Sequence, residues 1–333
     1  MRLSKLIASV RGPRTGERIL SRLQIDPGLR DKIPGPVPRA VVAMALNAIL
    51  LDDLLQRVPT ARAYVEDLVA GGGKVTFDHG ALRTIHFGKG AVAALPDGQA
   101  AFTRILEPLG YGLAGVYPLD RLRMTGCAYR HLDFPETIPQ FFLSELHVER
   151  FSLKFGIAAH YVFDSAVDPI DGPGLALLYA LGRDGSASAD LAVAGLPSLV
   201  AAFGRQHAMP HLDDYRALLT ESAEAAWIAT EGNVFNHATD RVADVEAVAE
   251  AQRALGRDVK DAVEVSASGR VRQTAFRADP VARDFRLNDG VDTLAVPGSF
   301  YEFISRDALP GGGLDLDFDT GNAQGIFAMT RTA

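Results

Sequence analysis

Apolar residues recur at spacings of three and four through the first 70 residues, a pattern typical of amphipathic helices. The clearest example is PRAVVAMALNAILLDDLLQRV, residues 38–58. Its mostly apolar run, Ala40 to Leu51, is about half as long as a membrane span and is closed by Asp52 and Asp53, so it predicts a buried helix. Three glycines at 71–73 end this region. We therefore expect residues 1–73 to form a helical lead-in that packs on the rest of the chain.

The pattern changes at Lys74, where short β-like runs separated by polar and glycine-containing segments begin. They are KVTF (74–77), LAGVYPL (113–119), RLRMTGCAYRHLDF (121–134) and IPQFFLSELHV (138–148). A helical pattern over residues 99–109 lies between the first two runs. This order, a strand, a helix and three strands, predicts a βαβββ unit that curls around a site.

A similar order returns in the second half of the chain. After an Ala- and Leu-rich helical insertion predicted at 189–219, AAWIATE (225–231) has the composition of a strand. An amphipathic helix is expected at 242–255, followed by β-like AVEVS, RVRQTAFRA, DTLAVPG and SFYEFISR. The sequence therefore predicts an α+β fold, in which residues 74–333 form a core of two βαβββ modules.

Composition narrows the possible partners. The 333 residues carry a formal net charge of −7, which disfavours nucleic acid and anionic membrane surfaces as partners. The single cysteine, Cys127, excludes an internal disulfide framework and a thiolate-rich metal cage, as a reducing cytoplasm would allow. The N-terminal apolar run, Leu6 to Val10, is too short for a signal peptide. We expect a cytoplasmic protein whose metal, if it binds one, is held by histidine and carboxylate.

The stretch FDHGALRT, residues 77–84, combines a potential metal ligand with a fixed cation. His79 and Arg83 are four residues apart, so their side chains leave the backbone on the same side in a helix or a strand. Imidazole can bind a metal, and guanidinium can bind a carboxylate through two hydrogen bonds. The pair indicates a small anionic substrate bound beside a metal, although an isolated pair of this kind is more often a surface histidine and a solvated arginine.

Glu302 is the most informative carboxylate, because apolar residues surround it in SFYEFISR. Such a run is typical of a strand that is buried on both faces, and a buried carboxylate needs a cation or a proton donor. Two partners are equally plausible from the sequence. One is a metal, and the other is Arg306, which lies four residues along the same strand face.

A second histidine, His237 in FNHAT, lies at the start of the second module. A lone histidine in such a context is more often a hydrogen-bonded core residue than a ligand. Together, however, His79, His237 and Glu302 supply two imidazoles and one carboxylate, the set that non-haem Fe(II) oxygenases use. His131, Glu145 and His147 are weaker candidate ligands, and we expect His86, His160, His207 and His211 to face solvent.

Four stretches together resemble the iron-dependent 2-oxoadipate dioxygenase/decarboxylases, which have a vicinal-oxygen-chelate-like core. They are HGALRT (79–84), RMTGCAYRHLDFPETIPQFFLSELH (123–147), FNHATDRV (235–242) and VPGSFYEFISR (296–306). SFYEFISR and TGNAQGIF also resemble the C-terminal parts of hydroxyphenylpyruvate dioxygenase and hydroxymandelate synthase, in which a strand glutamate binds iron and a C-terminal helix closes the site.

The resemblance implies that His79, His237 and Glu302 hold Fe(II) and that Arg83 binds the substrate carboxylate far from the iron. It also implies conversion of 2-oxoadipate and O2 to 2-hydroxyglutarate and CO2, as a step in lysine breakdown. Two alternatives stay open at this point. One is a related dioxygenase for an aromatic 2-oxo acid, against which Arg83 argues, and the other is a non-catalytic module that binds a small ligand. The sequence leaves the oligomeric state open.

Overall fold

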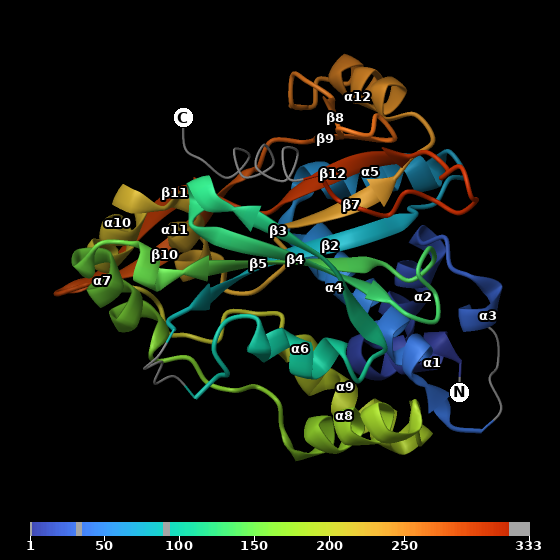
Figure 1. The fold of residues 1–333 in the computed structure, drawn as a ribbon, viewed down its shortest axis with the longest axis horizontal. Coiled ribbons are helices and arrows are strands. Elements are labelled where there is room, and N and C mark those ends of the chain that lie inside the picture. Colours follow the sequence, from blue (N-terminus) through green and yellow to red (C-terminus); the bar gives the residue numbers. More distant parts are fainter. Residues whose placement is uncertain (1, 31–34, 89–93, 320–333) are drawn as a thin grey trace.

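An eight-stranded mixed sheet crosses the middle of the molecule, with helices on both of its faces (Figure 1). The computed structural model describes residues 2–30, 35–88 and 94–319. In spatial order, the strands of the sheet are β3 (Tyr111–Leu119), β4 (Met124–His131), β5 (Gln140–His147), β2 (Phe77–His86), β7 (His237–Arg241), β12 (Phe300–Arg306), β9 (Val271–Ala275) and β8 (Glu264–Val265).

The sheet consists of two βαβββ modules, which confirms the predicted fold class. In the first module, β2 is followed by α6 (Ala100–Leu106) and then by β3, β4 and β5, and β5 returns parallel to β2. In the second, β7 is followed by α12 (Val245–Ala254), β8, β9 and β12, and β12 returns parallel to β7. The first strands of the two modules, β2 and β7, pair antiparallel at the centre of the sheet. Residues at the start of each module are therefore brought together.

One strand predicted for the second module lies outside the main sheet. The run DTLAVPG falls in β11 (Gly290–Pro297), which pairs only with β10 (Pro280–Leu287) in a separate hairpin. This hairpin is inserted between β9 and β12. Its strands alternate between exposed and partly buried positions, as expected for a ribbon with one solvated face.

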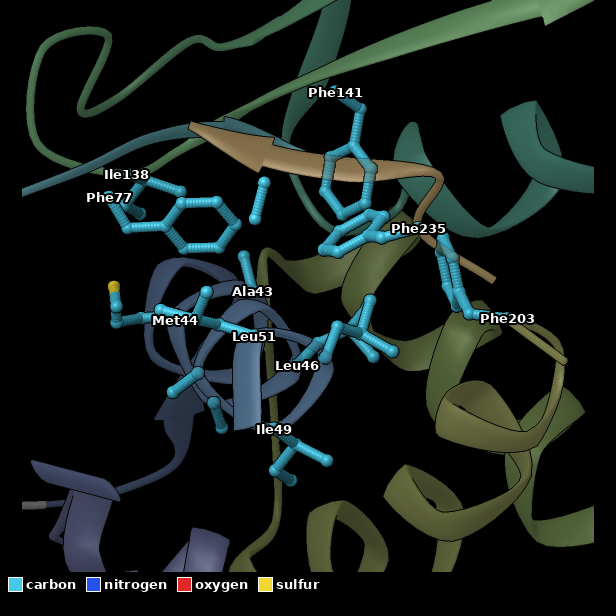
Figure 2. Packing of buried hydrophobic residues seen from close by; sticks show 14 of the residues in the cluster. Ala43, Met44, Leu46, Ile49, Leu51, Phe77, Ile138, Phe141, Phe203 and Phe235 are labelled. Carbon is cyan, nitrogen blue, oxygen red and sulfur yellow. The ribbon is translucent and has the colours of Figure 1, made fainter. Parts of the chain in front are cut away.

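The helices before the first module are α1 (Leu3–Arg11), α2 (Pro13–Arg22), α3 (Pro27–Arg30), α4 (Arg39–Arg57) and α5 (Pro59–Ala70). Fifteen residues of α4 are buried, in agreement with its nearly continuous apolar sequence. The helix ends before Pro59, which begins α5 at a position where its missing N–H is tolerated. In Figure 2, Leu46 and Ala43 of α4 lie close to the aromatic rings of Phe141 and Phe235 beneath the sheet. Helix α4 therefore supports the central strands from one side.

A helical region lies between the two modules and is longer than the expected 189–219. It contains α7 (Leu153–Phe163), α8 (Gly172–Asp184), α9 (Ala189–Ala201), α10 (Leu212–Glu221) and α11 (Ala223–Glu231). The remaining short elements are β1 (Val37–Pro38), β6 (Ser186–Ala187), η1 (Asp120–Leu122) and η2 (Val148–Arg150). Within the described residues, no helix has both the length and the apolar character that crossing a bilayer requires.

The prediction that AAWIATE forms a strand is wrong, because this segment is most of helix α11. The Ser222 hydroxyl accepts a hydrogen bond from the Ala225 N–H and caps the helix, which ends before Gly232 with a positive φ of 68°. All of its residues after Ala223 are buried, so no polar face produces a helical period. Helices α7, α10 and α11 pack against the sheet face that carries Ala81 and Phe142, which we call the site face.

Candidate metal centre

Three side chains from three neighbouring strands meet on the site face at the centre of the sheet. His79 of β2 is in register with Thr239 of β7, and Thr239 is in register with Glu302 of β12. His237 lies two residues before Thr239 on β7, so both side chains point to the same face. The antiparallel pairing of the two modules thus creates the cluster from positions far apart in sequence.

The cluster is compact and buried. The Nε2 atoms of His79 and His237 lie 3.3 and 3.6 Å from Glu302 Oε2. A ligand atom from each of the three residues lies within 4.8 Å of the other two. Their exposed fractions are 3%, 4% and 1%. Water can therefore satisfy little of their hydrogen-bonding capacity.

One atom of this cluster is left without a hydrogen-bond partner. Thr239 Oγ1 donates to Glu302 Oε2 at 2.6 Å, but Glu302 Oε1 is buried and has no hydrogen-bond donor among the residues that the structure describes. A buried carboxylate oxygen without a partner is costly, and a cation at the centre of the three side chains would satisfy it. Two imidazoles and a carboxylate are also a common donor set for divalent transition metals. The residues present therefore fit a metal ion.

Each histidine is held from behind by a neighbouring residue in sequence. His79 Nδ1 lies 2.9 Å from Asp78 Oδ1, and His237 Nδ1 lies 2.9 Å from Asn236 Nδ2, the amide nitrogen of that side chain. An asparagine amide can present its carbonyl to Nδ1–H. Nδ1 of His79 can therefore carry the ring proton, and Nδ1 of His237 can do so when the Asn236 amide is turned by 180° and its oxygen faces the ring. Each Nε2 then keeps its lone pair for a metal. Such outer partners orient metal-binding histidines in many proteins.

The electrostatics of the pocket favour a positive charge at its centre. Burial alone would lower the pKa of His79, but the hydrogen bonds and charges of Asp78 and Glu302 outweigh it and raise this pKa above its usual value. Burial raises the pKa of Glu302, yet the two histidines more than compensate and hold it below its usual value. Burial lowers the pKa of His237 to about 3, which keeps its imidazole neutral. A metal ion and the proton on His79 would compete for the same position.

Arg83 lies on the same strand face as His79 and is fully buried. Its guanidinium carbon is 4.9 Å from the ring centroid of Trp227, whose Nε1–H donates to the Gly298 carbonyl. The Asn233 side-chain amide donates to the Arg83 carbonyl at 2.8 Å. The positive charge of Arg83 contributes to the lowered pKa of His237, after burial and the charge of His79.

A small cavity opens beside the cluster. It is lined by the three candidate ligands together with Phe142, Gln273, Phe318 and Asp319. The ring of Phe318 lies 4.8 Å from those of His79 and Phe142. Its backbone N–H donates to the Tyr117 hydroxyl at 3.2 Å. The segment that ends the described chain therefore covers one side of the cluster.

A known enzyme family matches the part of the chain that forms the cluster. A model of the 2-oxoadipate dioxygenase/decarboxylase family matches residues 55–313, which include all three candidate ligands and Arg83. The chain belongs to this family. It is therefore an enzyme of the dioxygenase class. None of the curated proteins matches the sequence significantly.

Solved structures agree with the family and the fold. A protein from Ralstonia eutropha JMP134 described as a member of the glyoxalase superfamily is 52% identical, with a TM-score of 0.91, and the match covers 96% of this chain and 98% of that one. Hydroxyglutarate synthases in complex with 2-oxoadipate from Oryza sativa and Pseudomonas putida are 21% and 19% identical, with TM-scores of 0.66 and 0.63. These matches cover 90% of this chain in both cases and 97% and 74% of the synthases. The predicted vicinal-oxygen-chelate-like fold is confirmed.

The four site residues predicted from the sequence lie on one face of the sheet. Arg306, which the sequence offered as an alternative partner for Glu302, has a different partner. Arg306 pairs with Asp78, with Nη2 2.9 Å from Asp78 Oδ1, and not with Glu302. Asp78, the partner of both His79 and Arg306, was not predicted from the sequence. An aspartate directly before a candidate ligand was the available signal.

The weaker candidates lie elsewhere. Glu145 and His147 alternate with Ser144 on β5, so their side chains face away from the site. His131 lies on the same far side, and burial lowers its pKa to about 4. The expectation that His207 faces solvent is wrong, because it is buried and its Nε2–H donates to the Ala229 carbonyl. His86 is the last residue of β2 and is half-buried. The sequence TGNAQGIF, expected to close the site, lies outside the described residues.

Proposed function

We propose that this chain is an Fe(II)-dependent 2-oxoadipate dioxygenase/decarboxylase. The observation that carries the proposal is the buried cluster of His79, His237 and Glu302 with Arg83 on the same strand face, in a chain of this family. The reaction would convert 2-oxoadipate and O2 to 2-hydroxyglutarate and CO2, as a step in lysine breakdown.

His79, His237 and Glu302 would hold the metal. Two imidazoles and one carboxylate leave three positions of an octahedral ion open, and Fe(II) bound there supplies redox chemistry and positions for a 2-oxo acid and for O2. Asp78 and Asn236 fix the orientation of the two imidazole rings from behind. Thr239 donates a hydrogen bond to Glu302 Oε2, the oxygen that faces both imidazoles, and so fixes the orientation of the carboxylate.

Arg83 would select the substrate by its second carboxylate. Its Cα is four strand residues from that of His79, which corresponds to about 13 Å. A dicarboxylic acid that reaches the metal with its 2-oxo end can place its far carboxylate toward the guanidinium. The Trp227 ring and the hydrogen bond from Asn233 hold Arg83 in place. An acid without the second carboxylate would lose the ion pair that 2-oxoadipate can form with Arg83.

Aromatic side chains would keep water away from the reacting groups. Phe300 stacks on His237 with ring centroids 4.8 Å apart, and Phe142 and Phe318 line the cavity. Exclusion of water strengthens the electrostatic interactions of Arg83 and Glu302 with a bound substrate or ion.

The overall reaction balances without a further reactant. The carbon–carbon bond between the first carboxylate and the keto carbon breaks, and that carboxylate leaves as CO2. Of the two oxygen atoms of O2, one enters the new carboxylate formed at the keto carbon. The other enters the hydroxyl group on the adjacent carbon, which is oxidised, as O2 is reduced.

The test compares two substrates and two variants. Iron-loaded protein is assayed for O2 uptake with 2-oxoadipate and with 2-oxohexanoate, which has the same chain length but no second carboxylate. We expect Arg83→Met to reduce kcat/KM for 2-oxoadipate about 100-fold or more, since losing one partner of a buried charge pair costs about 2–5 kcal/mol. Its activity with 2-oxohexanoate should change far less.

Arg123→Met is the matched control. Arg123 also stacks on an aromatic ring, with its guanidinium carbon 4.4 Å from the Phe151 centroid, but it is partly exposed. This variant should keep the preference for 2-oxoadipate. If Arg83→Met keeps that preference as well, Arg83 does not bind the second carboxylate. Uptake only with 4-hydroxyphenylpyruvate would favour an aromatic substrate, and ligand binding without turnover would favour a binding module.

A further inference from the structure

A second group of potential metal ligands lies on the face of the sheet opposite to the site face. It consists of His86, His147 and Glu149, and a ligand atom from each lies within 4.8 Å of the other two. His86 is the last residue of β2, His147 is the last residue of β5, and Glu149 follows in η2. His86 is seven residues from His79 along β2, or about 23 Å. The group is therefore separate from the central cluster.

The parallel pairing of β2 and β5 places the two imidazoles side by side. His86 and His147 are register partners, and their ring centroids are 5.5 Å apart in an edge-to-face arrangement. The His147 Nδ1 lies 3.6 Å from Glu149 Oε1. Two histidines at the same level on adjacent strands, with a carboxylate beside them, converge on one point in space.

The outer partners of both rings leave lone pairs for an ion. His86 Nδ1 lies 2.8 Å from Asp97 Oδ2, so Nδ1–H can donate to Asp97 and Nε2 keeps its lone pair. The other oxygen of Asp97 accepts the Phe87 N–H at 3.0 Å, which fixes the carboxylate. His147 Nε2 lies 2.8 Å from the Thr125 hydroxyl, so Nε2–H can donate there and Nδ1 is left toward Glu149. Such carboxylate and hydroxyl partners are typical behind metal-binding histidines.

We propose that His86, His147 and Glu149 form a second divalent-metal site of the zinc class. Two imidazole nitrogens and one carboxylate oxygen are a donor set that suits Zn²⁺ or Co²⁺, with water in the remaining position of a tetrahedral ion. The side chains of His86, His147 and Glu149 are 33%, 17% and 52% exposed, so an ion can enter from solvent. This inference does not rest on the proposed reaction.

An ion at this site would connect the ends of β2 and β5 to η2. Strand β2 also carries His79 and Arg83, so the ion would fix the far end of the strand that supports the central cluster. Because an unfolded chain does not hold the three ligands together, binding would raise the stability of the folded chain in proportion to the logarithm of the ion concentration above Kd.

The site can be tested by measuring how many Zn²⁺ ions the full chain binds. Protein stripped with a chelator is titrated with ZnCl2 by isothermal titration calorimetry, and bound zinc is measured after gel filtration. We expect two equivalents for the wild type, one for His86→Ala and one for His147→Ala. Asp97→Asn should retain the second equivalent with an affinity about 10- to 100-fold weaker, because only the outer partner is changed.

His160→Ala is the matched control. His160 is also a half-exposed histidine with an aspartate partner, Asp164 at 3.0 Å, but it is not part of this group. It should bind two equivalents. His86→Gln provides a second variant in case His86→Ala fails to fold, and the first equivalent reports an intact central cluster. A single equivalent in the wild type that the His86 variants also bind, or His86 variants that bind as much zinc as His160→Ala, would overturn the proposal.

Discussion

The pairing of Arg306 with Asp78 offers a direct test of how the site is built. Both side chains are almost fully buried, with exposed fractions of 0% and 1%. Arg306 donates to both oxygens of Asp78 at 2.9–3.2 Å. Its Nη1 also donates to the carbonyls of Asp315 and Asp317, at 2.8 and 3.0 Å. One guanidinium therefore connects the partner of His79 to the segment that carries Phe318.

We predict that Arg306→Met lowers the free energy of unfolding by about 4 kcal/mol. Removing one partner of a buried ion pair typically costs about 3–5 kcal/mol, because the remaining charge is left uncompensated. Losing the hydrogen bonds to two carbonyls adds about 1 kcal/mol each where water cannot replace them. The remaining bond between Asp78 and His79 offsets part of this loss. A double variant, Asp78→Asn with Arg306→Met, should be less destabilised than the sum of the two single variants.

The assay is urea unfolding of the metal-free protein, followed by far-ultraviolet circular dichroism. Arg272→Met is the control, since Arg272 forms a similar two-bond pair with Asp307 at the surface, with exposed fractions of 26% and 48%. Exposed pairs contribute about 0–1 kcal/mol. If Arg306→Met costs no more than Arg272→Met, or if the single-variant losses simply add, the buried pair does not hold this part of the fold together.

Three further predictions concern the same strands. Thr239→Val removes the hydroxyl that donates to Glu302 Oε2. It should weaken Co²⁺ binding at the central cluster about 10- to 100-fold in calorimetry. Unchanged affinity would mean that Thr239 does not orient Glu302 for the ion. Burial raises the pKa of Asp240 to about 7, so folded Asp240 holds its proton at pH values where an unfolded aspartate is ionised. The free energy of unfolding should therefore fall as the pH rises from about 4 to 7, by up to about 1.4 kcal/mol per pH unit. Asp240→Asn should remove this pH dependence in urea unfolding measured across the same range. Gly80→Ala would place a Cβ 2.2 Å from the Phe235 ring and should cost about 1–3 kcal/mol in the same urea assay, whereas no loss would mean that the ring moves freely.

The sequence predicted the two modules well, because alternation, turn residues and chain order determine them locally. The strand runs around Tyr117, Ala128, Phe142 and Phe303 lie in the sheet, whereas only the last residue of the predicted run KVTF, Phe77, belongs to β2, which continues to His86. Helix α11 was mistaken for a strand because a helix buried on all sides has no polar period. Its cap at Ser222 and the glycine at 232 were the signals that could have identified it.

The candidate ligands were found by residue type and resemblance, but their convergence depends on strand register. Nothing local in FNHAT places His237 beside a glutamate 65 residues later; the parallel pairing of β7 with β12 does so. The choice of Asp78 as the partner of Arg306 likewise depends on how β2 lies two strands away from β12. Sequence spacing allowed Arg306 to pair with Glu302, since both lie on one strand face, and left this pair and a metal equally plausible. Tertiary packing instead pairs Arg306 with Asp78.

The most direct test of the proposed function is the fate of labelled oxygen. Iron-loaded protein is incubated with 2-oxoadipate under ¹⁸O2, and CO2 and the product acid are analysed by mass spectrometry, with Glu302→Ala as the control for the ligand cluster. We predict one CO2 and one 2-hydroxyglutarate per O2 consumed, with one labelled atom in the new carboxylate and the other in the hydroxyl group. A product that carries no label, or equal turnover by Glu302→Ala, would contradict it.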